Sequence, residues 1–264
     1  MKSNRIIWGI VSLVVLITIA VTTGTLDGLG QEKSGLLPKA TPPTDGPDFS
    51  KYGITDYDAV VSVAASESER RMRKSQRYDS QGWVQRNSHP ETGKIGRYTE
   101  REPPPTIPTE ESDLIVTGRI AGVTAHLSND KRGVYSEFTV KVDQVPKNIV
   151  PIDIERGSLI TVDRAGGVVR YPNGQTVLYL DSEDGLPEVG REYLMFLTSD
   201  KKSENYAIRT LYELQETRTV PLDHGRRMDD IKRMGKSDFV KSVREKLSRP
   251  VVDDAPRRNH EDQE

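Results

Sequence analysis

Four histidines are the residues whose chemistry would first suggest a metal site or a general acid–base catalyst, because imidazole binds zinc and titrates near neutral pH. They are His89, His126, His224 and His260. Each stands in a polar segment, and none has a His, Asp or Glu at metal-site spacing on a common helix or strand face. We therefore expect all four to be surface residues and predict no metal ligand among them.

Two short runs resemble phosphate and calcium loops but lack essential residues. Gly235-Lys236-Ser237 resembles the end of a phosphate loop, yet Asp stands at position 230, where the leading glycine belongs. The run 181–185 has the wrong ligand spacing for calcium and no closing glutamate, so we expect an exposed acidic turn. The chain has no cysteine, which excludes disulfides and thiol chemistry. The sequence therefore predicts no catalytic, cofactor-binding or metal-binding residue, and no cofactor.

The charge balance bounds the choice of partner. The chain has 264 residues, 38 of them basic and 40 acidic, for a net charge of −2. Such a balance gives no global attraction to nucleic acid, so we expect no nucleic-acid partner. Charged residues make up 30 % and hydrophobic residues only 34 %, which predicts that part of the chain lies outside any packed core.

The N-terminus predicts contact with a membrane. Lys2 and Arg5 precede an apolar run that reaches Thr25, and a helix of about 20 residues spans a bilayer core. Residues 1–25 are therefore a transmembrane anchor, which we favour, or a cleaved export signal. The basic flank places the N-terminus in the cytoplasm and the body outside it, held to the membrane through residues 6–25. Residues 26–54 resemble a flexible stalk.

The middle of the chain predicts a charged helix and a linker. We expect the helix over residues 55–78, with Thr55 as its N-cap. Its basic cluster has two readings, either a solvated face paired with Glu67 and Glu69, which we favour, or a site for an acidic partner or lipid phosphates. The cluster comprises Arg70, Arg71, Arg73, Lys74 and Arg77. Residues 79–111 are rich in proline and predict a stiff linker.

Residues 112–222 carry the pattern of a small all-β domain. Alternating apolar residues predict six or seven strands, and the run Tyr193–Leu197 predicts a strand buried on both faces. Asn173-Gly174 predicts a tight hairpin turn. Strands of this spacing, without long helices between them, favour a barrel or a sandwich.

A family resemblance favours the barrel. Asp113–Ile120, Tyr135–Val142, Gly157–Val162, Gly166-Gly167 and Val189–Leu197, in that order, resemble a small OB-like, netrin-like β-barrel of exported bacterial proteins of unknown function. The resemblance covers residues 112–198. The related metalloproteinase inhibitors chelate metal through an N-terminal cysteine, and this chain has none, so that activity does not carry over.

The C-terminal part predicts one helix and a disordered end. Within residues 223–249, Ser237 resembles an N-cap, and Phe239, Val243 and Leu247 form an apolar stripe. We expect this helix to dock on the barrel. Residues 250–264 are charged and predict disorder.

Taken together, these features define our functional hypothesis. We expect a non-enzymatic, membrane-anchored extracytoplasmic protein whose β-barrel binds a protein or an envelope component. The alternative is an exported hydrolase that uses carboxylates in a barrel cleft.

Overall fold

The computed structural model describes residues 49, 51–59, 65–84, 94–97, 105–181, 184–200, 205–223 and 229–249. They belong to one compact unit, residues 45–264. The expected anchor, most of the expected stalk and the expected disordered end lie outside the described residues. In the part of the chain that is described, no helix is both long and apolar enough to cross a membrane.

The described chain is mainly β, with a helix near the C-terminus, as expected. Strands account for 47 % of it and helices for 17 %. The strands are β1 (Ile54–Asp56), β2 (Lys94–Arg97), β3 (Leu114–Leu127), β4 (Val134–Asn148), β5 (Leu159–Ala165), β6 (Gly167–Arg170), β7 (Thr176–Asp181), β8 (Glu192–Asp200), β9 (Asn205–Leu214) and β10 (Thr219–Pro221). The helices are α1 (Ala65–Ser75), the short 3-10 helix η1 (Gln76–Tyr78), α2 (Asp229–Lys232) and α3 (Lys236–Ser248).

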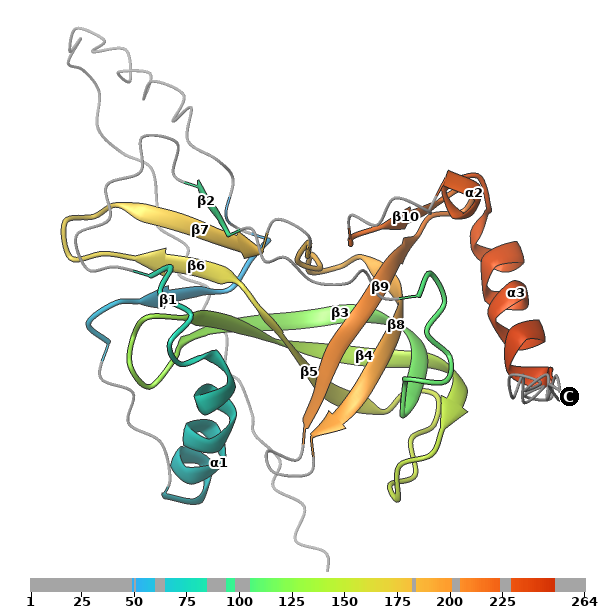
Figure 1. Cartoon of the computed structure of the whole chain (residues 1–264), viewed down its shortest axis with the longest axis horizontal. Coiled ribbons are helices and arrows are strands. Elements are labelled where there is room, and N and C mark those ends of the chain that lie inside the picture. The colour runs from blue at the N-terminus through green and yellow to red at the C-terminus, as the bar shows by residue number, and fades with distance from the viewer. Residues whose placement is uncertain are drawn as a thin grey trace, which may run out of the picture. The chain divides into compact units, whose positions relative to one another are not determined.

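The larger sheet curls strongly but is not a closed barrel. Its strand order is β10-β9-β5-β4-β3-β8, and β8 also pairs with β9. The ladder between β5 and β9 covers only two residue pairs, Val162 with Tyr206 and Asp163 with Ala207. It is short because β5 ends at Ala165 and the chain then leaves for the second sheet (Figure 1). The expected barrel is corrected to a curled sheet with a short parallel seam.

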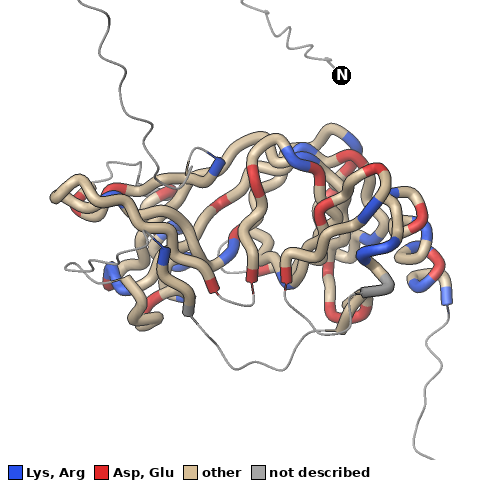
Figure 2. Tube along the Cα trace, turned by 90° about the horizontal axis from the view of Figure 1, so that it is seen from above, with Lys and Arg blue, Asp and Glu red and all other residues tan. Residues whose placement is uncertain are grey.

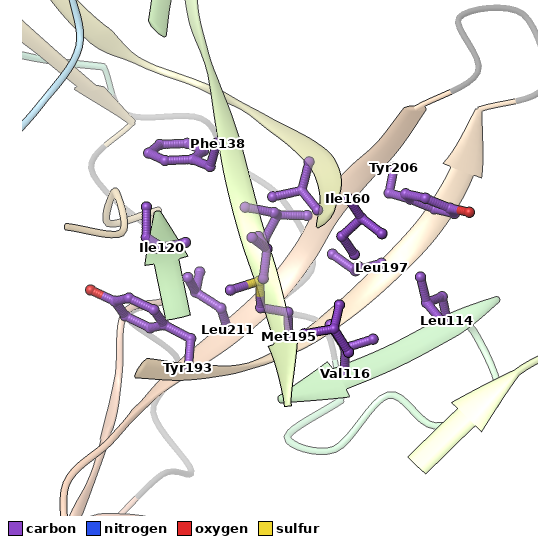
Figure 3. Packing of buried hydrophobic residues seen from close by; sticks show 14 of the residues in the cluster. Leu114, Val116, Ile120, Phe138, Ile160, Tyr193, Met195, Leu197, Tyr206 and Leu211 are labelled. Atoms are coloured by element: carbon purple, nitrogen blue, oxygen red, sulfur yellow. The ribbon is translucent and has the colours of Figure 1, made fainter. Parts of the chain in front are cut away.

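Strand β8 is buried on both faces, which confirms the prediction made for Tyr193–Leu197. Tyr193, Met195 and Leu197 point into the main core, where side chains from β3, β4, β5 and β9 meet them (Figure 3). Leu194 and Phe196 point to the opposite face, where they pack in one cluster with Phe239 and Val243 of α3. The expected docking of the C-terminal helix is therefore confirmed, although the helix begins at Lys236, with Gly235 rather than Ser237 as its N-cap.

A second sheet has the order β1-β6-β7-β2, and its two outer strands correct the sequence prediction. Thr55 lies in β1, not at a helix N-cap, and β1 pairs in parallel with β6. Strand β2 lies within the expected linker and pairs in parallel with β7. Tyr52, from the end of the expected stalk, packs on the main core. These segments therefore belong to the folded body.

Two glycines with positive φ angles form the hairpin turn and the link between the two sheets. Gly174, with a φ angle of +84°, lies in the turn between β6 and β7, as predicted from Asn173-Gly174. Gly166, with a φ angle of +111°, joins β5 to β6. A Cβ atom there would lie 2.9 Å from the carbonyl oxygen of Tyr179. Only glycine permits both the angle and the close approach.

Candidate functional site

The last turn of α1 buries a cation against the sheet. Only 2 % of the Lys74 side chain is exposed, and its Nζ lies 2.5 Å from Oε1 of Glu137 on β4. His126 Nε2, on β3, lies 3.6 Å from the other carboxylate oxygen of Glu137. The solvated helix face and the exposed histidine predicted from the sequence are therefore wrong for Lys74 and His126, both of which face Glu137.

These partners set the ionisation of Glu137. Burial opposes its ionised form, but hydrogen bonds from His126 and Lys74 outweigh burial and lower the pKa of Glu137 to about 2. A buried carboxylate and ammonium that satisfy each other avoid the cost of an isolated charge. The pair thereby fixes the position of α1 on the sheet.

A second buried carboxylate lies beside the first. Asp163, on β5, is fully buried and accepts hydrogen bonds from the Tyr78 hydroxyl at 2.5 Å and from Arg77 at 2.9 Å. Arg77 also lies 3.4 Å from Asp200. Burial raises the pKa of Asp163, and Arg77 and Tyr78 offset it only in part. Through these bonds η1 is attached to β5.

Aromatic stacking completes the attachment of η1 and places a serine. The rings of Tyr78 and Tyr135 are stacked with their centroids 4.5 Å apart, and the Tyr135 hydroxyl lies 3.0 Å from the Ser75 hydroxyl. Burial raises the pKa of Tyr135 to about 12. A phenol of that pKa takes no proton from a serine at neutral pH, so this pair is suited to positioning rather than to nucleophilic catalysis.

We call α1, η1 and the strands that they contact the platform. An open groove, which we call the α1 groove, lies along α1. Its volume is about 240 Å³. It is lined by α1, by the turn after β1 and by the loop between β3 and β4. The polar residues that line it are Thr55, Asp56, Ser68, Arg71, Ser75, Ser128, Asn129 and Lys131. The lining therefore offers mainly hydroxyl, amide and charged groups.

The β3–β4 loop is held in one conformation. Asp130 accepts hydrogen bonds from the Ser128 hydroxyl and from the backbone of Ser80 and Arg132. These bonds lower the pKa of Asp130, although burial acts in the opposite direction. Lys131 has a φ angle of +56°, which is unfavourable for a lysine. A loop that holds this angle without glycine is kept in place by the contacts around it.

A third polar cluster lies at the seam between β5 and β9. Arg164, on β5, pairs with Asp223 and lies 3.1 Å from Asp184. Thr210, on β9, also donates a hydrogen bond to Asp223. Burial raises the pKa of Asp223, and Arg164 offsets it only in part. The expected exposed acidic turn is therefore wrong for Asp181, which is buried, and Asp184 pairs with Arg164.

The remaining candidates from the sequence are not brought together. His89, His224 and His260 lie outside the described residues. Lys236, from the rejected phosphate-loop run, lies 2.7 Å from Glu192. Among the described residues, no group of three or more His, Asp or Glu side chains is placed to hold a metal ion.

Sequence reasoning missed the residues that build the platform. Tyr78 follows Lys74 by four residues and Ser75 by three, and both spacings place residues on the same side of a helix. That face is polar, so a search for an apolar stripe does not find it.

Comparison with protein-family models and with curated protein sequences finds no match.

Proposed function

We propose that this protein is a non-enzymatic binding module, anchored in a membrane through residues 6–25, with its body outside the cytoplasm. Its ligand is a protein or another component of the cell envelope. The observation that supports this proposal best is the α1 groove, a polar recess on a rigid platform. The charges that hold α1 and η1 on the sheet, Lys74 with Glu137 and Arg77 with Asp163, are paired with one another, as expected where charges position a surface rather than react.

The strand connections support an OB-like assignment for the larger sheet. If β3, β4, β5, β8 and β9 are numbered 1 to 5 in chain order, they lie in the sheet in the order 1-2-3-5-4. Strand 4 also pairs with strand 1, and strands 3 and 5 pair in parallel. OB folds are five-stranded, partly open barrels, and their loop between the first two strands often contributes to ligand binding. Here that loop, residues 128–133, lines the α1 groove.

The exported hydrolase receives less support. A carboxylate-based hydrolase needs two carboxyl groups that face one cleft. The buried carboxylates Asp163 and Asp223 and the half-buried Glu137 are each paired with a cationic side chain. The side chains that point into the curled sheet are hydrophobic (Figure 3).

Photo-crosslinking of the full chain in its native envelope tests the binding module. A photoreactive amino acid at Met72, which lines the α1 groove and is 55 % exposed, should give a discrete adduct. Leu159 is the matched control, since it is 66 % exposed and lies outside the groove. Equal labelling from both positions, or no adduct from Met72, would contradict the proposal.

The anchor has its own test. Fractionation followed by N-terminal sequencing of the mature protein should recover an intact N-terminus in the membrane fraction. A soluble product that begins near Thr25 would rule out the anchor and favour a cleaved signal.

A further inference from the structure

Arg71 stands out among the cations of α1. It is half-buried and lines the α1 groove. Its expected partner, Glu67, pairs instead with Arg70 at 3.1 Å. Within the described ranges, no carboxylate lies at ion-pair distance from Arg71. An arginine that is partly removed from water and has no anionic partner is suited to receive an anion from outside.

The other charges of the groove leave it with a positive character. Lys131 Nζ donates to the carbonyl oxygen of Tyr57 at 3.0 Å, an uncharged acceptor that leaves its charge unneutralised. The acidic lining residue, Asp56, lies 3.5 Å from Arg170. Two cations therefore line the groove, whereas its carboxylate already has a cationic neighbour.

We propose that the α1 groove binds a phosphate group, with Arg71 as its principal ligand and Lys131 as a second cation. This inference rests on the proposed binding function and names its chemistry. A planar guanidinium offers paired N–H donors that match the oxygens of a phosphate. The hydroxyl of Ser68 lines the same groove and is a further donor.

The size of the groove limits the ligand. Its volume of about 240 Å³ is below the range of roughly 300–1,000 Å³ that encloses drug-sized molecules. The recess itself therefore accommodates one phosphate group, and anything attached to that phosphate extends out of the open groove. The phosphate is either free or carried by a lipid headgroup, and the experiment separates the two sources.

Attraction by the whole surface does not explain such binding. Figure 2 shows basic and acidic residues interspersed along the described chain, and the net charge is −2. The selectivity must come from the groove itself, and a single substitution there should remove it.

Calorimetric titration of the full chain in an uncharged detergent tests the inference, with inorganic phosphate as the probe. We expect saturable binding to the wild type and a loss of about tenfold or more in affinity for Arg71→Gln. Arg73→Gln is the matched control, because it removes the same charge from an exposed position of the same helix and should change affinity by less than about twofold. Arg71→Lys keeps the charge, loses the paired donors and should fall between them.

Circular dichroism melting of each variant verifies that the fold is retained. Absence of saturable phosphate binding to the wild type below about 10 mM would overturn the inference. So would an equal loss of affinity in Arg71→Gln and Arg73→Gln, since the bound phosphate would then lie outside the groove.

Flotation with vesicles distinguishes the source of the phosphate. Phosphatidylcholine vesicles with and without phosphatidic acid serve as probes for residues 45–264, the compact unit without the expected anchor. Selective, Arg71-dependent association with phosphatidic acid supports a headgroup, whereas saturable binding of inorganic phosphate alone supports a free anion. A Met72 crosslink that survives without phosphate binding would overturn this inference and leave the binding module intact. Phosphate binding without any Met72 crosslink would support this inference and contradict the proposed protein or envelope ligand.

Discussion

At the scale of single residues, the fold depends on charges that are buried in pairs. Lys74 with Glu137 and Arg77 with Asp163 hold α1 and η1 on the sheet. Such pairs contribute little net free energy, but loss of one partner is costly because the other charge stays buried. They therefore act mainly to fix the place of α1, and so the position of Arg71 in the groove.

Glu137 should make stability depend on pH. Its pKa falls from 4.5 in the unfolded chain to about 2 in the fold. Its ionised form thus stabilises the fold above about pH 4.5, by up to about 3 kcal/mol, and this contribution is lost as the pH falls toward 2. We expect urea unfolding at pH values from 7 to 2 to show that the difference in free energy of unfolding between wild type and Glu137→Gln becomes smaller as the pH falls. A difference that does not change with pH would show that Glu137 titrates normally.

At the scale of elements, local patterns were predictable and distant partners were not. The unbroken apolar run Tyr193–Leu197 correctly predicted β8, the apolar stripe at four-residue spacing predicted α3, and the Asn173-Gly174 turn predicted the β6–β7 hairpin. Strand β1 could not be predicted, because its three residues form a strand only by pairing with residues 168–170, far along the chain. The groove was missed for the same reason, since its walls come from α1 and from a loop about 60 residues later. Only the basic cluster signalled it, without distinguishing Arg71 from its neighbours.

The double burial of β8 predicts a large effect at Phe196. This side chain is fully buried and lies 6.0 Å, centroid to centroid, from the ring of Tyr212. Phe196→Ala should lower the free energy of unfolding by about 3–5 kcal/mol, measured by urea denaturation. Arg209→Ala, at an exposed position of β9, should change it by less than about 0.5 kcal/mol. A loss under about 1 kcal/mol at Phe196 would contradict its burial.

The contact between η1 and the β3–β4 loop should also be sensitive to substitution. A Cβ atom at Gly133 would lie 2.1 Å from the carbonyl oxygen of Tyr78, whereas one at Gly122 would meet nothing within 4 Å. Gly133→Ala should therefore destabilise the protein by at least about 1–3 kcal/mol, because backbone must move. Gly122→Ala should be neutral or slightly stabilising. Thermal melting compares the two, and equal melting temperatures would show that the loop yields without cost.

At the scale of the whole molecule, two sheets share one chain because β5 leaves the larger sheet early. The fold class was predictable from composition and alternation. The second sheet was not, since half of its strands come from segments that look like helix and linker. The function proposed here depends on that sheet, because the turn after β1 forms one wall of the groove.

The cluster at the seam should govern how the larger sheet opens. Replacement of Asp223 by Ala leaves Arg164 without its closest partner, at a cost of about 3–5 kcal/mol. Native-state hydrogen exchange should then accelerate at residues 162–163 and 206–207, by about a hundredfold or more. Asp153→Ala, at an exposed carboxylate, should leave those rates unchanged. Acceleration spread evenly over all strands would mean that Asp223 acts on global stability alone.

The short parallel ladder between β5 and β9 is the place where the larger sheet opens locally at the lowest cost. Backbone bonds join β5 to β9 at only two residue pairs, and the side chains of Arg164, Asp223 and Thr210 bridge the same two strands. Opening there breaks few bonds and leaves the β8–β9 and β3–β4 ladders intact. The body can therefore flex along one line while both the α1 groove and the α3 face keep their geometry.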